Sequence, residues 1–140
     1  GDVYKRQPMD EVIINPALHS AIGGLTLLTA LVATALNWTA LRKGSPGQGA
    51  SHASLILLQL LLLAQAAVGI KLLDQGMGVI QKYVHYLGGL GALALLLLPA
   101  WLPARLRRPA LPAWTATASL LFIVMTFFIG QLYVRSLQNG

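Results

Sequence analysis

The chain has 140 residues, of which 56% are hydrophobic and only 10% are charged. Soluble domains carry about 25% charged residues, so this composition indicates that lipid surrounds much of the protein. The net charge of +6 does not indicate nucleic-acid binding. The basic residues stand in short clusters between long apolar runs, which is how membrane proteins distribute charge. The chain contains no cysteine, which excludes disulfides, thiolate metal sites, iron–sulfur clusters and covalent attachment of a c-type haem.

The first eight residues, GDVYKRQP, are polar and unlike the sequence that follows them. We expect residues 1–8 to be a non-native or disordered leader, and residues 9–140, which begin at Met9, to form a single transmembrane domain. The leader is not expected to be a signal peptide, because no small-residue cleavage site follows the first long apolar run.

Four apolar segments each reach the roughly 20 residues that a helix needs to cross about 30 Å of hydrocarbon. They span residues 17–41, 53–73, 79–102 and 111–134. Asn15-Pro16 is a typical helix start, and Pro99 is expected to kink or end the third helix. No segment shows the period-2 alternation of a transmembrane strand.

The connections between these segments are short and rich in helix-breaking residues, at 42–49, around Gly76-Met77-Gly78 and at 103–112. Short connections make successive helices antiparallel. The sequence therefore predicts an all-α integral membrane protein, a four-transmembrane-helix up-down-up-down bundle whose first and third helices run in the same direction.

The charges at the helix ends predict the orientation. One side receives five basic residues: Arg42, Lys43, Arg105, Arg107 and Arg108. The other receives Lys71, Lys82 and Arg135, together with Asp10, Glu11 and Asp74. The positive-inside rule places the first side in the cytoplasm and both termini outside, in a bacterial inner membrane. The aromatic residues agree, with an inner belt of Trp38, Trp101 and Trp114 and an outer group of Tyr83, Tyr86 and Tyr133.

Two histidines lie inside the apolar segments, where a polar side chain is unfavourable unless it has a partner. His19 and His85 lie at similar depth near the outer ends of parallel helices, and each is followed four residues later by a glycine, Gly23 or Gly89. Histidine and glycine then share a helix face. Small residues continue both faces: Thr26, Ala30, Ala92 and Ala94.

Paired imidazoles beside small residues are what a six-coordinate haem b requires in a helical bundle. We therefore predict a cofactor site formed by His19, His85, Gly23 and Gly89, with the haem iron between the two histidines. Each imidazole would also need an acceptor for its other ring nitrogen, with Ser20, Gln81 or a backbone carbonyl as candidates. His52 belongs instead to the opposite membrane interface.

A structural reading stands beside this one. Intramembrane histidines also form interhelical hydrogen bonds, and lipid-embedded helices normally pack through small residues. The polar residues Gln59, Gln65, Asn37 and Thr34 favour a structural role, with a quinone headgroup or a haem propionate as the alternative. Lys71 either pairs with Asp74 or joins Lys82 in neutralising propionates. Packing is the expected role of Phe122, Met125, Phe127 and Phe128.

The run from Leu55 to Leu98 (LILLQLLLLAQAAVGIKLLDQGMGVIQKYVHYLGGLGALALLLL) resembles part of the heme A synthase family. The shared features are an alanine- and glycine-rich helix, an outer loop, and a helix that opens with a haem-ligating histidine. The spacing from His19 to His85 resembles the ligand interval in each four-helix half of those enzymes. The resemblance implies that His19 and His85 are axial haem ligands near the outer face.

Three departures from that family limit what the resemblance implies. The chain has one four-helix unit where the family has two, and its histidines fall on the first and third helices instead of the second and fourth. No Asp or Glu lies inside a predicted helix, so the family's acidic catalytic residue is missing. The resemblance therefore implies a related haem-binding bundle without the oxygenase activity.

Two functions follow from these observations. The first is a small membrane cytochrome b that transfers electrons or serves as a subunit of a respiratory assembly. The alternative is a cofactor-free accessory or assembly subunit. Partners are the lipid bilayer and other membrane subunits or a second copy. A transporter is disfavoured because no charged residue marks an ion path, and an enzyme because no catalytic carboxylate or nucleophile set is present.

Overall fold

The computed structural model describes residues 12–77 and 82–140, and the side chains of Lys82 and Leu137 fall outside that description. The described elements are α1 (Pro16–Arg42), α2 (Gly49–Asp74), α3 (Lys82–Trp101), the 3-10 turn η2 (Ala104–Leu106) and α4 (Leu111–Gln138). Four helices are long and apolar enough to cross a membrane. The predicted all-α four-helix membrane bundle is confirmed. Three predictions lie outside the described residues: the leader 1–8, the acidic pair Asp10 and Glu11, and the third-helix start at residue 79.

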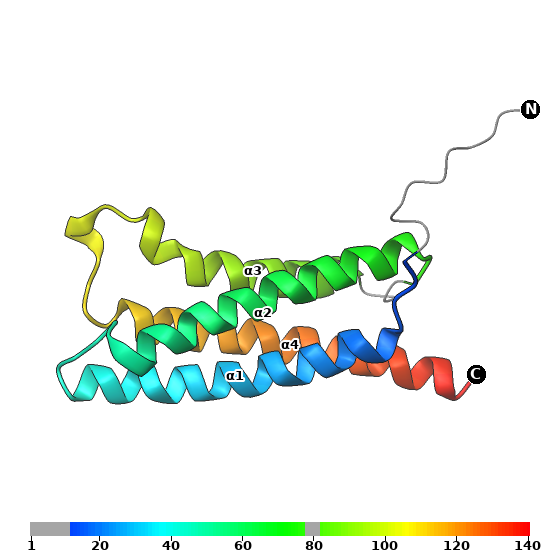
Figure 1. The fold of residues 1–140 in the computed structure, drawn as a ribbon, viewed down its shortest axis with the longest axis horizontal. Coiled ribbons are helices and arrows are strands. Elements are labelled where there is room, and N and C mark those ends of the chain that lie inside the picture. The colour runs from blue at the N-terminus through cyan, green and yellow to red at the C-terminus, as the bar shows by residue number, and fades with distance from the viewer. Residues whose placement is uncertain (1–11, 78–81) are drawn as a thin grey trace, which may run out of the picture.

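The helices form an antiparallel bundle with two ends (Figure 1). At one end, here called the Pro16 end, α1 begins, α2 ends, α3 begins and α4 ends. The opposite end, called the Arg42 end, holds the 42–49 turn and the segment from α3 to α4. Helix α1 packs against α2 and α4, and α3 packs against α4 and less extensively against α2. Helices α1 and α3 therefore occupy opposite corners of the bundle.

The helix boundaries follow from local chemistry. The Asn15 side chain accepts a hydrogen bond from the backbone N–H of Ala17 at 2.9 Å, which confirms the predicted start at Asn15-Pro16. Gly44 and Gly76, with φ of 72° and 80°, follow the ends of α1 and α2 in the left-handed region that glycine tolerates best. Helix α3 continues through Pro99 and ends at Trp101, as predicted for a helix that the proline terminates.

The centre of the bundle contains small side chains that let the helices approach closely. The buried cluster consists of Ala30, Ala33, Leu58, Leu62, Ala92, Leu96 and Ile123. Helices α3 and α4 approach most tightly at Gly88, where an added Cβ would overlap the hydroxyl oxygen of Thr126. The expectation that Ala94 shares the inner face with Ala92 is wrong, because Ala94 is exposed. Residues two positions apart in a helix point about 200° away from each other around the axis.

Large apolar side chains cover the outside of the helices. The exposed residues include Leu25, Leu28, Leu31, Leu60, Leu63, Leu87, Leu121, Phe128 and Leu132. Such a surface would be unfavourable in water, and in hydrocarbon it is the expected exterior. The chain is an integral membrane protein whose outer surface contacts the lipid bilayer.

Polar side chains in the body of the bundle are hydrogen-bonded within or between helices. Four side chains donate a hydrogen bond to a neighbouring helix. Two are amides: Asn37 Nδ2 donates to the Ser51 carbonyl at 3.2 Å, and Gln59 Nε2 to the Leu96 carbonyl at 3.3 Å. The others are Ser119 Oγ, which donates to the Ala92 carbonyl at 3.0 Å, and Trp38 Nε1, which donates to Thr117 Oγ1 at 2.8 Å. The hydroxyl of Thr34 donates to the Ala30 carbonyl at 2.8 Å. Asn37, Thr34 and Gln59 therefore have the structural role favoured by the sequence.

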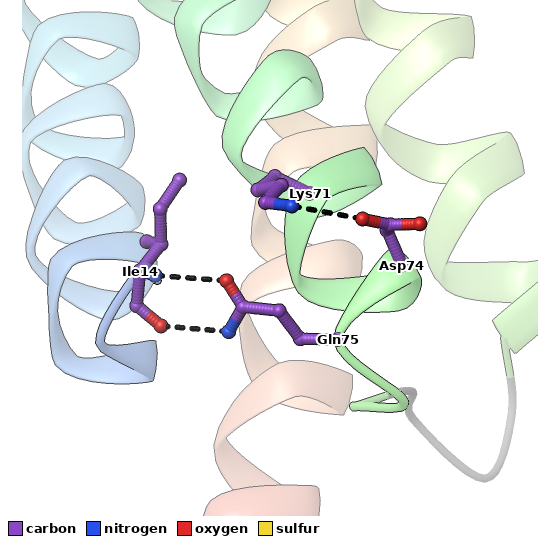
Figure 2. A network of polar contacts seen from close by, with 4 residues as sticks. All are labelled: Ile14, Lys71, Asp74 and Gln75. Carbon is purple, nitrogen blue, oxygen red and sulfur yellow. Dashed lines mark hydrogen bonds and ion pairs between the residues drawn. The ribbon is translucent and has the colours of Figure 1, made fainter. Parts of the chain in front are cut away.

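A polar network closes the Pro16 end (Figure 2). Gln75 Oε1 accepts from the Ile14 N–H at 2.8 Å, and Gln75 Nε2 donates to the Ile14 carbonyl at 3.0 Å. The Lys71 ammonium donates to Asp74 Oδ2 at 2.8 Å, which confirms the predicted Lys71–Asp74 pair. The network fixes the segment before α1 against the end of α2.

Candidate functional site

A cavity lies inside the Pro16 end of the bundle. The space open to the centres of water-sized spheres is about 150 Å³, well above the roughly 10–15 Å³ that one water needs on this measure. The cavity extends from Pro16, at the end of the bundle, inward to Thr26, Leu62 and Ile123. All four helices contribute to its walls.

His19 from α1 and His85 from α3 both line this cavity. Their ring centres are 6.0 Å apart, and the ring planes meet at 60°. The two side chains come from helices at opposite corners of the bundle, so they approach each other across the cavity. The structure thus brings together the two histidines that the sequence singled out.

The two imidazoles have different hydrogen-bond partners. His85 Nδ1 lies 3.2 Å from the carbonyl oxygen of Thr126 on α4. His19 Nε2 lies 3.5 Å from Gln65 Nε2 on α2, and the same amide nitrogen donates to the His19 carbonyl at 3.0 Å. His19 Nδ1 and Gln65 Oε1 are buried and have no hydrogen-bond partner among the described residues. Asn37 Oδ1, near the opposite end of α1, is likewise buried without a partner among the described residues.

Each of the four helices contributes one glycine to the cavity wall: Gly23, Gly69, Gly89 and Gly130. Each glycine follows a polar cavity residue by four positions, in the order His19, Gln65, His85 and Thr126. A Cβ on Gly69 would lie 3.3 Å from His19 Cε1, and one on Gly130 would lie 3.6 Å from His85 Cε1. The glycine of α2 therefore leaves room for the His19 ring, whereas a Cβ on Gly130 would make an ordinary van der Waals contact with the His85 ring.

Sequence reasoning placed Gly23 and Gly89 in the site but missed Gly69, Gly130 and Thr126, and it grouped Gln65 with the structural polar residues. A signal was present, because α2 and α4 repeat the spacing of a polar residue and a glycine four positions later. Glycine spacing alone is also typical of ordinary membrane-helix packing, so the pattern acquires meaning only once the four positions meet.

Other predicted residues lie apart from the paired histidines. His52 is exposed near the start of α2, at the Arg42 end. Ser20 lines the cavity, whereas Gln81 lies outside the described residues. Lys71 is buried beside Asp74 and does not line the cavity, and the Lys82 side chain is outside the description. Of the expected acceptors for a ring nitrogen, His85 has a backbone carbonyl, that of Thr126.

The cavity offers neutral nitrogen ligands in an uncharged setting. No Asp, Glu, Lys or Arg is among the described residues that line it. Within residues 12–77 and 82–140, no group of three or more His, Cys, Asp and Glu side chains is placed to hold a metal ion. Two imidazoles alone are too few for the four-ligand sites typical of structural zinc.

The fold and the site define a class: an integral membrane four-helix bundle with a paired-histidine cavity near one end. Comparison of the chain with models of protein families, with curated proteins and with solved structures found no match.

Proposed function

We propose that this protein is a small membrane cytochrome b that binds one haem b between His19 and His85. The observation that carries the proposal is the approach of two imidazoles, 6.0 Å between ring centres, across a cavity in the bundle interior. Imidazole nitrogens are among the ligands that hold haem iron in proteins, and these two would come from facing helices of one bundle.

The ring orientation is also compatible with two axial ligands. His19 and His85 would hold the haem iron through one ring nitrogen each, and their rings meet at an interplanar angle of 60°. Two of the three buried polar atoms that lack partners among the described residues, His19 Nδ1 and Gln65 Oε1, belong to residues that line this cavity. Gly89 leaves open space beside it, since no side chain lies within 4 Å of where its Cβ would stand.

A bound haem would supply one-electron redox chemistry at its iron. The chain would supply the two axial nitrogens, a neutral apolar wall and the exclusion of bulk water. Its role is electron transfer, alone or as a subunit of a respiratory assembly with other membrane subunits or a second copy. The resemblance to half of a heme A synthase supports the same pair of ligands.

The distribution of charge supports a location and an orientation. The Arg42 end carries Arg42 and Lys43, with Arg105, Arg107 and Arg108 in the segment between α3 and α4. By the positive-inside rule this end faces the cytoplasm of a bacterial inner membrane, both termini face outward, and the haem lies near the outer surface.

A cofactor-free accessory subunit is the second candidate, and one observation favours it. The contacts of His19 with Gln65 and of His85 with the Thr126 carbonyl join neighbouring helices without any ligand. In that role both histidines would contribute only to packing.

The deciding experiment is the absorption spectrum of the protein purified in detergent from cells with ample haem supply. We expect a Soret band and, after reduction, the α-band of a six-coordinate low-spin haem. His19→Ala and His85→Ala should each abolish the low-spin spectrum, because each removes an axial ligand. His52→Ala is the matched control and should leave it unchanged. Wild-type protein without haem would contradict the cytochrome and support the accessory subunit.

A further inference from the structure

We infer that the Arg42 end of the bundle binds the headgroup of an anionic phospholipid. The site consists of Arg42 at the end of α1 and Arg108 just before α4, on either side of the contact between Trp38 and Trp114. The arginines bind the lipid phosphate, and the tryptophans contact the acyl chains next to it. The site lies at the opposite end of the molecule from the histidine cavity, so the inference does not depend on the proposed haem.

The positive charge at the Arg42 end has no acidic partner in the described part of the chain. Asp74 is the only acidic side chain within residues 12–77 and 82–140, and it lies at the Pro16 end, 2.8 Å from the Lys71 ammonium. The cations of the Arg42 end are all exposed: Arg42, Lys43, Arg105, Arg107 and Arg108. Clustered like charges repel one another, so a bound anion stabilises this end of the bundle.

A tryptophan contact brings the end of α1 to the start of α4. The turn after α1 and the segment before α4 lie at the same end of the bundle (Figure 1). The Trp38 and Trp114 rings pack edge-on with centres 5.1 Å apart, and Trp38 Nε1 donates to Thr117 Oγ1 at 2.8 Å. Arg42 follows Trp38 by four residues, so it lies on the same face of α1, the face that packs against α4.

The segment between α3 and α4 places Arg108 beside the start of α4. The N–H of Leu111, the first residue of α4, donates to the Arg108 carbonyl at 3.0 Å. Arg107 has a different role, because its guanidinium donates to the carbonyls of Leu102 at 2.8 Å and Ala100 at 3.4 Å, at the end of α3. The Arg108 side chain makes no such bond within the described residues, so its guanidinium is available to an external phosphate.

The apolar residues around these arginines favour a lipid over a soluble anion. Trp114, Trp101 and Leu106 are exposed by 60%, 82% and 52%. Tryptophan is favourable at the depth of lipid headgroups, and a guanidinium binds phosphate through paired hydrogen bonds. A phospholipid matches both groups, whereas a nucleic acid would leave the apolar side chains in water. An anionic lipid is preferred to a zwitterionic one because no headgroup amine offsets its phosphate.

Tryptophan fluorescence can test this site, because all three tryptophans of the chain lie at the Arg42 end. The full chain is placed in mixed micelles of neutral detergent and phosphatidylcholine, which leave both ends of the bundle accessible. Quenching by phosphatidylglycerol with brominated acyl chains is compared with quenching by brominated phosphatidylcholine at the same mole fraction. We expect the quenching to indicate a preference for phosphatidylglycerol of about tenfold. Equal quenching by the two lipids would overturn the inference.

Three glutamine variants distinguish a local site from the overall charge. Arg42→Gln and Arg108→Gln should each lower the preference for phosphatidylglycerol by about threefold to fivefold, because each removes one cation from the site. Arg135→Gln is the matched control: it removes the same charge from an exposed residue of α4 near the Pro16 end, and it should keep the wild-type preference. An equal loss in all three variants, or no loss in Arg42→Gln and Arg108→Gln, would contradict the assigned site.

Two further measurements use the wild-type protein, so they need no variant to fold. Raising the salt concentration from about 0.1 M to 1 M shortens the screening length from about 10 Å to 3 Å and should weaken the preference. Soluble glycerol 3-phosphate and a short DNA oligonucleotide should leave the quenching by phosphatidylglycerol unchanged. Relief of that quenching by either competitor would assign the arginines to a soluble phosphate or to nucleic acid, and a preference insensitive to salt would exclude the arginines as its cause.

Discussion

Gly23 and Gly89 occupy equivalent positions after the two histidines, yet a side chain would meet different surroundings at each. A Cβ on Gly23 would lie 3.0 Å from Gln65 Nε2 and 3.5 Å from the Phe127 ring. A Cβ on Gly89 would have no such neighbour within 4 Å, although Gly89 lines the cavity. Substitution at Gly23 therefore strains the packing between helices, whereas substitution at Gly89 fills the cavity.

Gly89→Leu should keep the fold and exclude the haem. The leucine side chain would extend into open space that the cofactor needs, so we expect haem content to fall about tenfold or more, equivalent to about 1.4 kcal/mol of binding. The measurements are the ratio of Soret to protein absorbance and the thermal unfolding temperature in detergent.

Gly24→Leu is the control for this substitution, since Gly24 has open space beside it but does not line the cavity. It should retain wild-type haem content. If Gly89→Leu carried as much haem as Gly24→Leu, the cofactor would not occupy the space beside Gly89.

At the level of elements, one side chain joins α2 to the segment before α1 at the Pro16 end through two hydrogen bonds to the backbone. Gln75, just after α2, pairs both its amide oxygen and its amide nitrogen with the backbone of Ile14, just before α1 (Figure 2). Pro16 and Met77, which adjoin these two segments, line the cavity. The pairing therefore holds one side of the cavity in place.

Gln75→Ala should loosen this end of α1. It removes two partly buried hydrogen bonds, each contributing about 0.5–1.5 kcal/mol net, so the Ile14 amide should exchange its hydrogen faster and the unfolding temperature should fall. Hydrogen exchange in detergent, read by mass spectrometry on the peptide that contains Ile14, measures the effect.

Gln48→Ala provides the comparison. Gln48 precedes α2 at the Arg42 end, and its side chain makes no capping hydrogen bond, so this variant should exchange like wild type around Ile14. Equal exchange in both variants would show that the Gln75 pairing does not hold the segment before α1.

For the whole molecule, the two ends of the bundle differ in charge and in aromatic residues. The Arg42 end has the basic cluster, and close to it the Trp38 and Trp114 rings pack edge-on with centres 5.1 Å apart. Trp101, at the end of α3, is 82% exposed. Tryptophan favours the membrane–water interface, and clustered arginine favours the cytoplasmic one. These features make the Arg42 end the expected cytoplasmic end.

Cysteine labelling in intact cells can measure this orientation, because the chain has no native cysteine. A cysteine at Ser45, in the turn between α1 and α2, should resist a membrane-impermeant thiol reagent. A cysteine at Ser136, exposed near the end of α4, should react with it. Labelling of Ser45→Cys with protection of Ser136→Cys would reverse the orientation and place the cavity near the cytoplasm.

The amino-acid sequence by itself determined the number of membrane helices, their approximate ends and their antiparallel order. The physical reason is local: a run of about 20 apolar residues is stable in lipid only as a helix. Asn15, Pro16 and Pro99 then mark boundaries through their own backbone chemistry. The sequence also singled out His19 and His85, because histidine inside a long apolar run is uncommon and needs a partner.

Only the tertiary structure decided which face of each helix points inward. In lipid the outer face is as apolar as the inner one, so the pattern of hydrophobic residues carries little information about rotation around the helix axis. That is why Ala94 was expected inside and is exposed, and why the sequence could not name the helix partner of Gln65, which is the His19 carbonyl. The contacts that distinguish His19 from His85 depend on the same rotations, which packing between helices determines.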